Sequence, residues 1–352
     1  MKMKKWTVLH VLKSNRFSGA EHVVTDIITS MPEVNSYYIS QKGPIEEVLK
    51  SKGIDYRMVD RLDRKSLLSI VREINPDIIH AHDFTASFYA VLCFSKKPVI
   101  SHLHHNVPWM KKVGFRSAAY LFSSLFYKKI LVVSKPVLEE FVFCRFIRRK
   151  TGVIGNPVNI EKIQKRTKEG KEEQYWDMVF VGRLSEEKNI PLLLDIMETL
   201  SQRLKSCSIV IVGAGDGEVY LRSEIESRNL ERYVTIKGFV ENPYSIMKHS
   251  GILVLPSKWE GFGLAAVEAL ALGKPVVCSG VGGLDDIVND SCGKKCGLDV
   301  AVYVDEIEKL LNDRDYYNRK CEGAACRAKE LDNFESYMEQ IKEVYDECKK
   351  VS

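Results

Sequence analysis

The sequence lacks the features of membrane-spanning and disulfide-stabilised proteins. No run reaches the roughly 18 uncharged apolar residues of a membrane-spanning helix, and the longest candidate, residues 117–127, is bounded by Arg116 and Lys128. The nine cysteines include no CxxC pair, which argues against a disulfide framework or a zinc site and indicates ordinary reduced cysteines. By spacing alone, Cys292 and Cys296 are an alternative pair of metal ligands.

The amino-terminal segment and the overall charge exclude two further classes. Residues 1–12 begin with basic residues, but the apolar run is short, alternates as in a strand and lacks a cleavage site, so we expect no secretion signal. The formal net charge of +5 on 352 residues is mild and predicts no nucleic-acid partner. We therefore expect a cytoplasmic protein, long enough for two domains.

Short apolar runs alternate with helical patterns along the chain. Several runs are apolar at consecutive positions, as expected of parallel strands that are buried on both faces. Such alternation favours an α/β fold with two Rossmann-like domains, each a doubly wound parallel sheet. We expect strands at residues 7–12, 37–40, 78–81, 99–102, 130–134, 178–181, 208–212, 234–236, 252–255 and 276–278.

A polar segment separates two series of strands. Residues 161–174 are almost all charged or polar and are interpreted as a linker, which places an N-terminal, acceptor-binding domain at 1–165 and a C-terminal, donor-binding domain at 166–332. Residues 333–352 contain an amphipathic helix that we expect to pack back on the N-terminal domain. Because such sheets bind ligands at their strands' carboxyl ends, two domains facing a central cleft suit a reaction that joins two substrates.

Two short segments that follow predicted strands carry glycines and cations. Residues 213–217 (GAGDG) place Gly213 and Gly215 where a backbone could approach a ligand closely; a tight turn is the alternative, and the GxGxxG spacing is absent. Residues 182–188 hold Arg183 and Lys188, a pair that suits a diphosphate. An exposed loop with unrelated charges is the alternative there.

A third segment, residues 256–268, follows another predicted strand and carries two acids. Its glycines open a helix, and a helix N-terminus favours an anion such as phosphate. Glu260 lies in the loop before this helix and Glu268 lies two turns into it, so we expect the carboxylates to contact different parts of one ligand, such as sugar hydroxyls. A helix with incidental acids is the alternative.

Together these segments resemble the retaining glycosyltransferases of the GT-B fold, specifically family 4. The family signature is Glu, seven residues, Glu, with Gly-Phe-Gly after the first Glu, and residues 260–268 match it. The family's phosphate-binding cations match residues 182–188, its glycine turn matches 213–217, and its loop near the nucleobase resembles 238–240. Because four motifs occur in order, the resemblance is specific.

The resemblance implies sugar transfer from a nucleoside-diphosphate sugar, with retention at the anomeric carbon. Arg183 and Lys188 would stabilise the departing diphosphate. Glu260 would lie beside the donor sugar, and Glu268 would bind the ribose hydroxyls. No cofactor or metal is expected, since the two cations replace a divalent ion and the DxD string at 313–315 is predicted to be surface. The other donor-binding residues implied are Gly213, Gly215, Val240, Gly261, Phe262, Gly263 and Leu264.

The N-terminal half resembles the family more loosely. Gly19 matches the first loop, where a glycine approaches the donor diphosphate and the acceptor, while Ser18 replaces a second glycine that the family usually has. His104 is the best match to a family histidine that approaches the donor sugar, with His102 and His105 as neighbouring alternatives. A metal site formed by these three histidines is a further alternative.

Residues 109–150 interleave aromatic and basic side chains. Between residues 111 and 150 there are ten Lys or Arg and two acids. This composition suits contact with an anionic membrane surface, although ordinary amphipathic helices are the alternative. On the membrane interpretation the protein is peripheral at the inner face of the plasma membrane and the acceptor is lipid-linked. Otherwise we expect a glycan acceptor, as in surface polysaccharide biosynthesis.

Three other functions compete with glycosyl transfer. A nucleotide-sugar epimerase of the same fold would bind the donor without an acceptor, and the Gly-Phe-Gly signature disfavours it. A non-enzymatic carbohydrate- or nucleotide-sugar-binding protein would leave the donor intact. A dehydrogenase is disfavoured because the GxGxxG spacing and an acidic ribose partner are missing.

Overall fold

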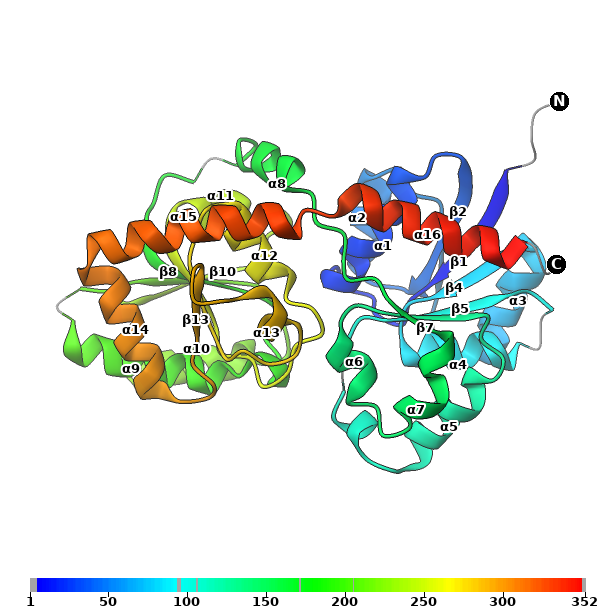
Figure 1. Ribbon diagram of the computed structural model, residues 1–352, viewed down its shortest axis with the longest axis horizontal. Coiled ribbons are helices and arrows are strands. Elements are labelled where there is room, and N and C mark those ends of the chain that lie inside the picture. The colour runs from blue at the N-terminus through cyan, green and yellow to red at the C-terminus, as the bar shows by residue number, and fades with distance from the viewer. Residues whose placement is uncertain (1–4, 94–95, 106, 171, 205, 350–352) are drawn as a thin grey trace. The chain divides into compact units, whose positions relative to one another are not determined.

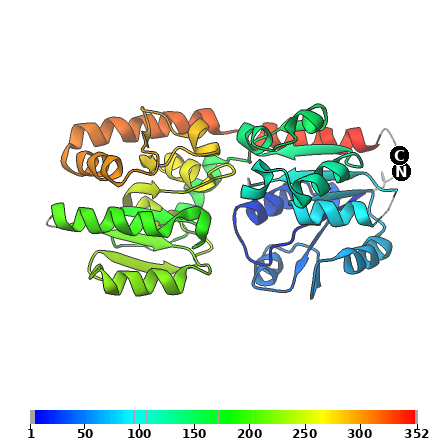
Figure 2. The same ribbon diagram turned by 90° about the horizontal axis from the view of Figure 1, so that it is seen from below.

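The chain divides at Pro157 into two α/β units. The computed structural model describes residues 5–93, 96–105, 107–170, 172–204 and 206–349. The first unit comprises Met1–Pro157 together with Phe334–Ser352, and the second comprises Val158–Asn333. Each unit is built on one parallel sheet with helices on both faces (Figures 1 and 2).

The first unit contains a seven-stranded sheet in the order β3-β2-β1-β4-β5-β6-β7. The chain runs outward from β1 to β3, returns to the centre and runs outward again from β4, so the sheet is doubly wound. Its strands are β1 (Trp6–Val11), β2 (Val34–Gln41), β3 (Tyr56–Val59), β4 (Ile78–Ala81), β5 (Val99–Leu103), β6 (Lys129–Val132) and β7 (Thr151–Val153).

The helices of the first unit include one from the end of the chain. Helix α16 joins this unit through Tyr345, whose hydroxyl lies 2.9 Å from His80, and through a 2.9 Å ion pair between Lys342 and Glu33. The helices are α1 (Gly19–Ser30), α2 (Ile45–Ser51), α3 (Arg64–Ile74), α4 (Phe84–Leu92), α5 (Phe115–Ser124), α6 (Lys135–Glu139), α7 (Cys144–Ile147) and α16 (Phe334–Lys349), with 3-10 turns η1 (Pro108–Lys111) and η2 (Arg148–Lys150).

The second unit contains a six-stranded sheet in the order β10-β9-β8-β11-β12-β13. Its central strands are mostly apolar and buried, and they form one hydrophobic core with the helices on either side. The strands are β8 (Trp176–Val181), β9 (Ile209–Val212), β10 (Val234–Gly238), β11 (Ser250–Leu255), β12 (Val276–Cys278) and β13 (Gly293–Lys295).

Most helices of the second unit connect these strands, and the last two follow the final strand, β13. The helices are α8 (Ile160–Thr167), α9 (Ile190–Arg203), α10 (Glu218–Ser227), α11 (Tyr244–Lys248), α12 (Leu264–Ala271), α13 (Gly283–Ile287), α14 (Val300–Asn312) and α15 (Arg314–Leu331), with the 3-10 turn η3 (Glu186–Lys188). None of the described helices combines the length and the apolar character needed to cross a bilayer.

The predicted α/β fold with two parallel sheets is confirmed, and each of the ten predicted strands coincides with an observed one. The expected linker at residues 161–174 is wrong in part, because α8 occupies its first half. Asn159 caps this helix by accepting a hydrogen bond from the Lys162 N–H at 2.7 Å, and Ile163 is buried. Since α8 lies in the second unit, the change of unit comes at Pro157–Val158 and not near residue 165.

We predict that Lys320→Met destabilises the second unit by about 2 kcal/mol, because hydrogen bonds from a charged donor contribute about that much. The buried ammonium of Lys320, on α15, donates to the carbonyl oxygens of Asp290 and Gly293 and so holds the entry to β13. Urea unfolding measures the effect. Lys329→Met, on the exposed side of the same helix, is the matched control and should change stability by less than about 0.5 kcal/mol.

Candidate active site

The predicted donor-binding segments of the second unit lie at one edge of its sheet. All strands are parallel, so their carboxyl ends share that edge. The neighbours β8 and β11 are the strands from which the chain runs to opposite sides, since β9 and β10 follow on one side and β12 and β13 on the other. Open α/β sheets bind ligands at this switch point.

The loops that follow β8 and β11 are joined by an ion pair. The Lys188 ammonium donates a hydrogen bond to the Glu260 carboxylate, and each side chain is 14% exposed. A backbone hydrogen bond of 2.8 Å from the Lys258 N–H to the Glu187 carbonyl oxygen supports the same contact. The structure therefore brings together a predicted phosphate-binding cation and a predicted sugar-binding carboxylate. Arg183 lies exposed at the start of the β8 loop.

The two predicted donor-binding glycines lie between neighbouring loops. Gly213 has φ +147°, and a Cβ there would meet the Gly182 carbonyl oxygen at 1.9 Å. A Cβ on Gly215 would meet the Leu184 carbonyl oxygen at 2.3 Å. These glycines thus permit the β9 loop to pack closely on the backbone of the β8 loop, which contains Arg183.

The Gly-Phe-Gly segment also packs against a glycine turn. Gly263 precedes α12 with φ +104°, and its Cβ would lie 2.7 Å from Leu284. Gly282, with φ +56°, would place a Cβ 1.8 Å from the Glu260 carbonyl oxygen. In the same segment Gly261 is buried, Phe262 is half-buried, and Leu264 is the first residue of α12.

Sequence reasoning did not assign Gly282 and Gly283 to this site. A Cβ on Gly283 would approach the Phe262 carbonyl oxygen to 2.2 Å, so both residues permit the loop after β12 to pack on the loop after β11. The signal was present in the sequence, because residues 280–283 (GVGG) follow the predicted strand 276–278 as the other glycine segments follow theirs.

Glu268 and Glu260 contact different side chains. The Glu268 carboxylate accepts a 3.0 Å hydrogen bond from the Tyr244 hydroxyl, and the Arg166 guanidinium lies 5.3 Å from the centre of the Tyr244 ring. Tyr244 was not predicted, because nothing in its local sequence indicates a partner 24 residues away. Val240 is half-buried after β10, at the same edge of the sheet but three strands from β11.

In the first unit, Gly19 begins α1 and is exposed. Ser18, at the cap position, donates a hydrogen bond to the Glu21 carboxylate, which is 2% exposed. This contact fixes the first turn of the helix that follows β1. The loop after β1 is also tied to that after β4, since the Lys13 N–H donates to the Asp83 carboxylate at 2.7 Å.

The structure distinguishes the three neighbouring histidines. His102 is fully buried on β5, His104 is 5% exposed just after it, and His105 is exposed. The Nε2 of His104 lies 3.2 Å from Nδ1 of His82, and burial, with the neighbouring His102 and His105, lowers the pKa of His104 well below its usual range. His104 is thus held as a neutral imidazole at the end of its strand.

Within the described part of the chain, His102 and His104 form a possible metal-binding group with His82, and His105 belongs to no such group. Cys292 and Cys296 likewise join no such group there. The DxD string is a surface feature as expected, since Asp313 caps α15 by accepting from the Tyr316 N–H at 2.8 Å.

Residues 109–150 divide into core and surface aromatics. Tyr120 and Phe141 are buried, whereas Phe115 is 87% and Phe146 75% exposed. Other exposed apolar side chains of this segment are Val113, Phe122, Leu125, Phe126 and Val142. Two of its cations pair with acids of the same segment, Lys111 with Glu140 at 3.2 Å and Arg148 with Glu139 at 3.9 Å. The segment thus exposes both apolar and basic groups.

Comparison with known proteins assigns the family. The model of glycosyl transferases group 1 matches residues 161–325, and that of glycosyltransferase family 4 matches residues 21–162. The chain belongs to glycosyltransferase family 4.

Individual relatives agree with this assignment. A glycosyltransferase of Methanocaldococcus jannaschii is 27% identical over 60% of this chain and 57% of its own length, so the chain spans little more than half of that relative. CapH, a capsular polysaccharide biosynthesis glycosyltransferase of Staphylococcus aureus, is 25% identical over 74% of this chain and 78% of its own. Anabaena HepE, solved with UDP-glucose, has a TM-score of 0.83 at 20% identity, covering 97% and 99% of the two chains, and shows the GT-B fold.

We predict that Gly213→Ala destabilises the second unit of this glycosyltransferase by about 3 kcal/mol or more, because the new Cβ would overlap the Gly182 carbonyl oxygen. Gly238→Ala is the matched control. Gly238 also has a positive φ, +69°, but nothing lies within 4 Å of its Cβ position. The Gly238→Ala variant should therefore lose only about 1 kcal/mol of stability, through backbone strain alone. Equal losses in urea unfolding would contradict the packing role.

Proposed function

We propose that the protein transfers a sugar from a nucleoside-diphosphate donor to a glycan or lipid-linked acceptor, with retention at the anomeric carbon. The Lys188–Glu260 pair carries this proposal, because it places a cation and a carboxylate from two loops at the switch point of the second sheet. A diphosphate needs the cation, and sugar hydroxyls need the carboxylate. In this proposal the first unit holds the acceptor.

The proposed chemistry depends on the charge of the leaving group. As the sugar–oxygen bond breaks, negative charge develops on the diphosphate while the sugar approaches an oxocarbenium ion. Cations that are already in position stabilise that charge without reorganisation. Lys188 is held in place by Glu260, and Arg183 lies on the same loop. We propose that these two side chains serve where a divalent ion would otherwise be needed.

The donor would also rearrange the ion pair. A diphosphate that binds Lys188 competes with Glu260 for the ammonium, which frees the carboxylate to accept hydrogen bonds from sugar hydroxyls. Glu268, oriented by Tyr244, would accept from the ribose. For Gly19 and His104 of the first unit, we propose the roles toward the donor that the family resemblance implies. HepE was solved with UDP-glucose and CapH is named for capsular polysaccharide, which supports a nucleotide-sugar donor and a surface polysaccharide product.

The experiment that tests the proposal is a donor screen followed by a transfer assay. A panel of UDP-, GDP-, ADP- and dTDP-sugars is examined by thermal shift, because a bound donor raises the melting temperature with the logarithm of its concentration. The stabilising donor is then supplied with acceptor oligosaccharides, and the anomeric configuration of the product is determined by NMR. An inverted product would contradict retention, and interconversion of the donor sugar without transfer would indicate the epimerase alternative.

We predict that Arg183→Met lowers kcat by about 100-fold, since removing one preorganised group that stabilises developing charge has effects of that size. The transfer rate, measured with excess EDTA present, should be unchanged in the wild-type protein. Lys258→Met is the matched control, because Lys258 lies in the neighbouring loop and pairs with Glu186 at 3.8 Å. Equal losses in the two variants would contradict the assignment of Arg183.

We also propose that the surface formed by residues 109–150 contacts an anionic membrane, which suits a lipid-linked acceptor. Phe115 and Phe146 are the most exposed aromatics of this segment, and Arg116 and Arg145 lie next to them in the chain. Exposed aromatic groups beside basic groups favour the interface of an anionic bilayer.

We predict that, at low salt, the wild-type protein sediments with phosphatidylglycerol–phosphatidylcholine vesicles but not with vesicles of pure phosphatidylcholine. The double substitution Phe115→Ser and Phe146→Ser should reduce the bound fraction severalfold. Phe239→Ser, which removes an exposed aromatic from the second unit, should leave it unchanged. Absence of wild-type binding to the anionic vesicles would exclude this surface.

A further inference from the structure

Five histidines lie on one face of the first sheet. His10 on β1 is the register partner of His80 on β4. Register partners in a parallel pair project to the same face, and so do residues two apart on a strand. His82, at the end of β4, therefore joins this face. His102 and His104 follow the same rule on the neighbouring strand β5 and stack on each other with ring centres 4.2 Å apart.

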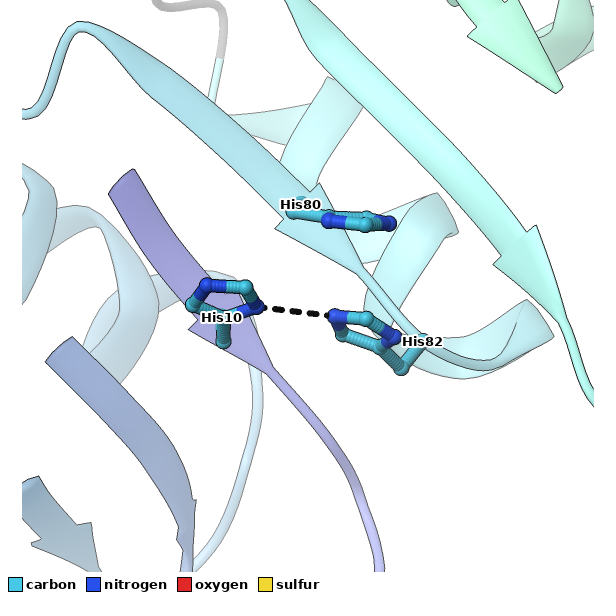
Figure 3. Close-up of side chains that lie close together, drawn as sticks. All are labelled: His10, His80 and His82. Carbon is cyan, nitrogen blue, oxygen red and sulfur yellow. Dashed lines mark hydrogen bonds between the residues drawn. The ribbon is translucent and has the colours of Figure 1, made fainter. Parts of the chain in front are cut away.

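Three of these histidines form a compact group (Figure 3). The Nδ1 of His10 lies 3.0 Å from the Nε2 of His82, and the His80 ring lies 4.0 Å from the His82 ring between centres. One ring nitrogen from each residue lies within 4.8 Å of the others. All three side chains are at most 1% exposed. Three imidazoles are the protein ligands of zinc sites in which a water molecule takes the fourth position.

Two nitrogens of the group lack the partner that burial normally requires. Among the described residues, no hydrogen-bond partner reaches Nε2 of His10 or Nε2 of His80. A buried polar atom without a partner is uncommon and indicates a missing water or ion. Nε2 of His80 could bind the same ion as Nδ1 of His10, whereas Nε2 of His10 points away from that ion. Burial also lowers the pKa of each of the three imidazoles, so they are neutral and present lone pairs. Neutral imidazole is the form that binds a metal.

The other nitrogens of His80 and His82 are engaged as in a metal site. Nδ1 of His80 lies 2.9 Å from the hydroxyl of the buried Tyr345, on α16. If Nδ1 of His80 carries the proton, it donates a hydrogen bond to the Tyr345 oxygen, and Nε2 of His80 is left as a ligand. In the same way Nδ1 of His82 lies 3.2 Å from Nε2 of His104, which leaves Nε2 of His82 for the group. Metal-binding histidines usually have such outer partners, which fix the tautomer.

We propose that His10, His80 and His82 bind one divalent transition-metal ion of the Zn²⁺ class. The ion would replace the proton between Nδ1 of His10 and Nε2 of His82. These nitrogens lie 3.0 Å apart, which is close to the distance of about 3.3 Å between two ligand nitrogens of tetrahedral zinc. It would connect β1 with β4 and, through Tyr345, with α16, so that the two ends of the chain are held to one sheet. Its role is structural, and sugar transfer does not pass through it.

The first test measures metal binding by the full-length protein without a histidine tag. After dialysis against EDTA, titration with ZnCl₂ should show about one ion bound per chain and a rise in melting temperature of about 5 °C. Binding of Co²⁺ should give a spectrum without a thiolate charge-transfer band, because the ligands are imidazoles and none of the nine free cysteines takes part. No zinc binding, or a cobalt–thiolate band, would overturn the proposal.

The second test uses two tyrosines of the same helix. Tyr345→Phe removes the oxygen beside His80 and should weaken zinc binding by about 10-fold or more. Tyr337→Phe is the matched control, because Tyr337 is also fully buried on α16 but its hydroxyl has no partner among the described residues, so the zinc affinity should stay within about twofold. Equal affinities in the two variants would overturn the site at His80.

A ligand variant and an activity measurement complete the test. His80→Gln should abolish the zinc-dependent rise in melting temperature. If this variant does not fold, the titration of the wild-type protein and the two tyrosine variants still test the proposal. The transfer rate at 25 °C should be equal with and without zinc, while the half-life at elevated temperature should be shorter without it. A transfer rate that depends on zinc would contradict the structural role. If no sugar transfer is found at all, the measurements of zinc binding still test the metal site.

Discussion

The ion pair between Lys188 and Glu260 is the contact on which the arrangement of the proposed donor site depends. It joins the loops after β8 and β11, the two strands at the switch point of the second sheet. Backbone packing supports each side of it, because Gly213 lies against the Gly182 carbonyl and Gly282 lies against that of Glu260. Four strand-end loops are therefore fixed relative to one another by one ion pair and several glycine contacts.

An ion pair that is largely buried is not retained for stability alone. Desolvation of two charges offsets much of their attraction, and an apolar pair of similar size is often as stable. In the proposed reaction the pair has a second state, with Lys188 on the donor diphosphate and Glu260 on the sugar. The donor-free protein then keeps the cation in position, and the cost of ordering its long side chain is met before the donor binds.

The sequence was sufficient for the central strands of the second sheet because these are buried on both faces and therefore mostly apolar at consecutive positions, as in β9 and residues 252–255 of β11. It was insufficient for the three strands that were missed, β3, β7 and β13, all of which lie at sheet edges. Edge strands are short and partly exposed, so their composition resembles that of loops, as GKK in β13 shows. The helix α8 was missed for a related reason, since only Ile163 of its eight residues is buried.

The candidate site was predicted where residues act through local spacing, as in residues 182–188 and 260–268. It was not predicted where a partner comes from a distant strand or helix. Tyr244 reaches Glu268 across 24 positions, and Tyr345 reaches His80 across 265. The histidine face arises only when β1, β4 and β5 align in register, which no local pattern indicates.

The measurement that tests the central claim most directly is a double-mutant cycle on Lys188 and Glu260, with kcat/KM for sugar transfer as the readout. If the two side chains act as one unit, Lys188→Met and Glu260→Gln each lower kcat/KM by about 100-fold, and the double variant is little worse than either. Losses that multiply to about 10,000-fold would show two independent groups, and full activity in either single variant would contradict the account.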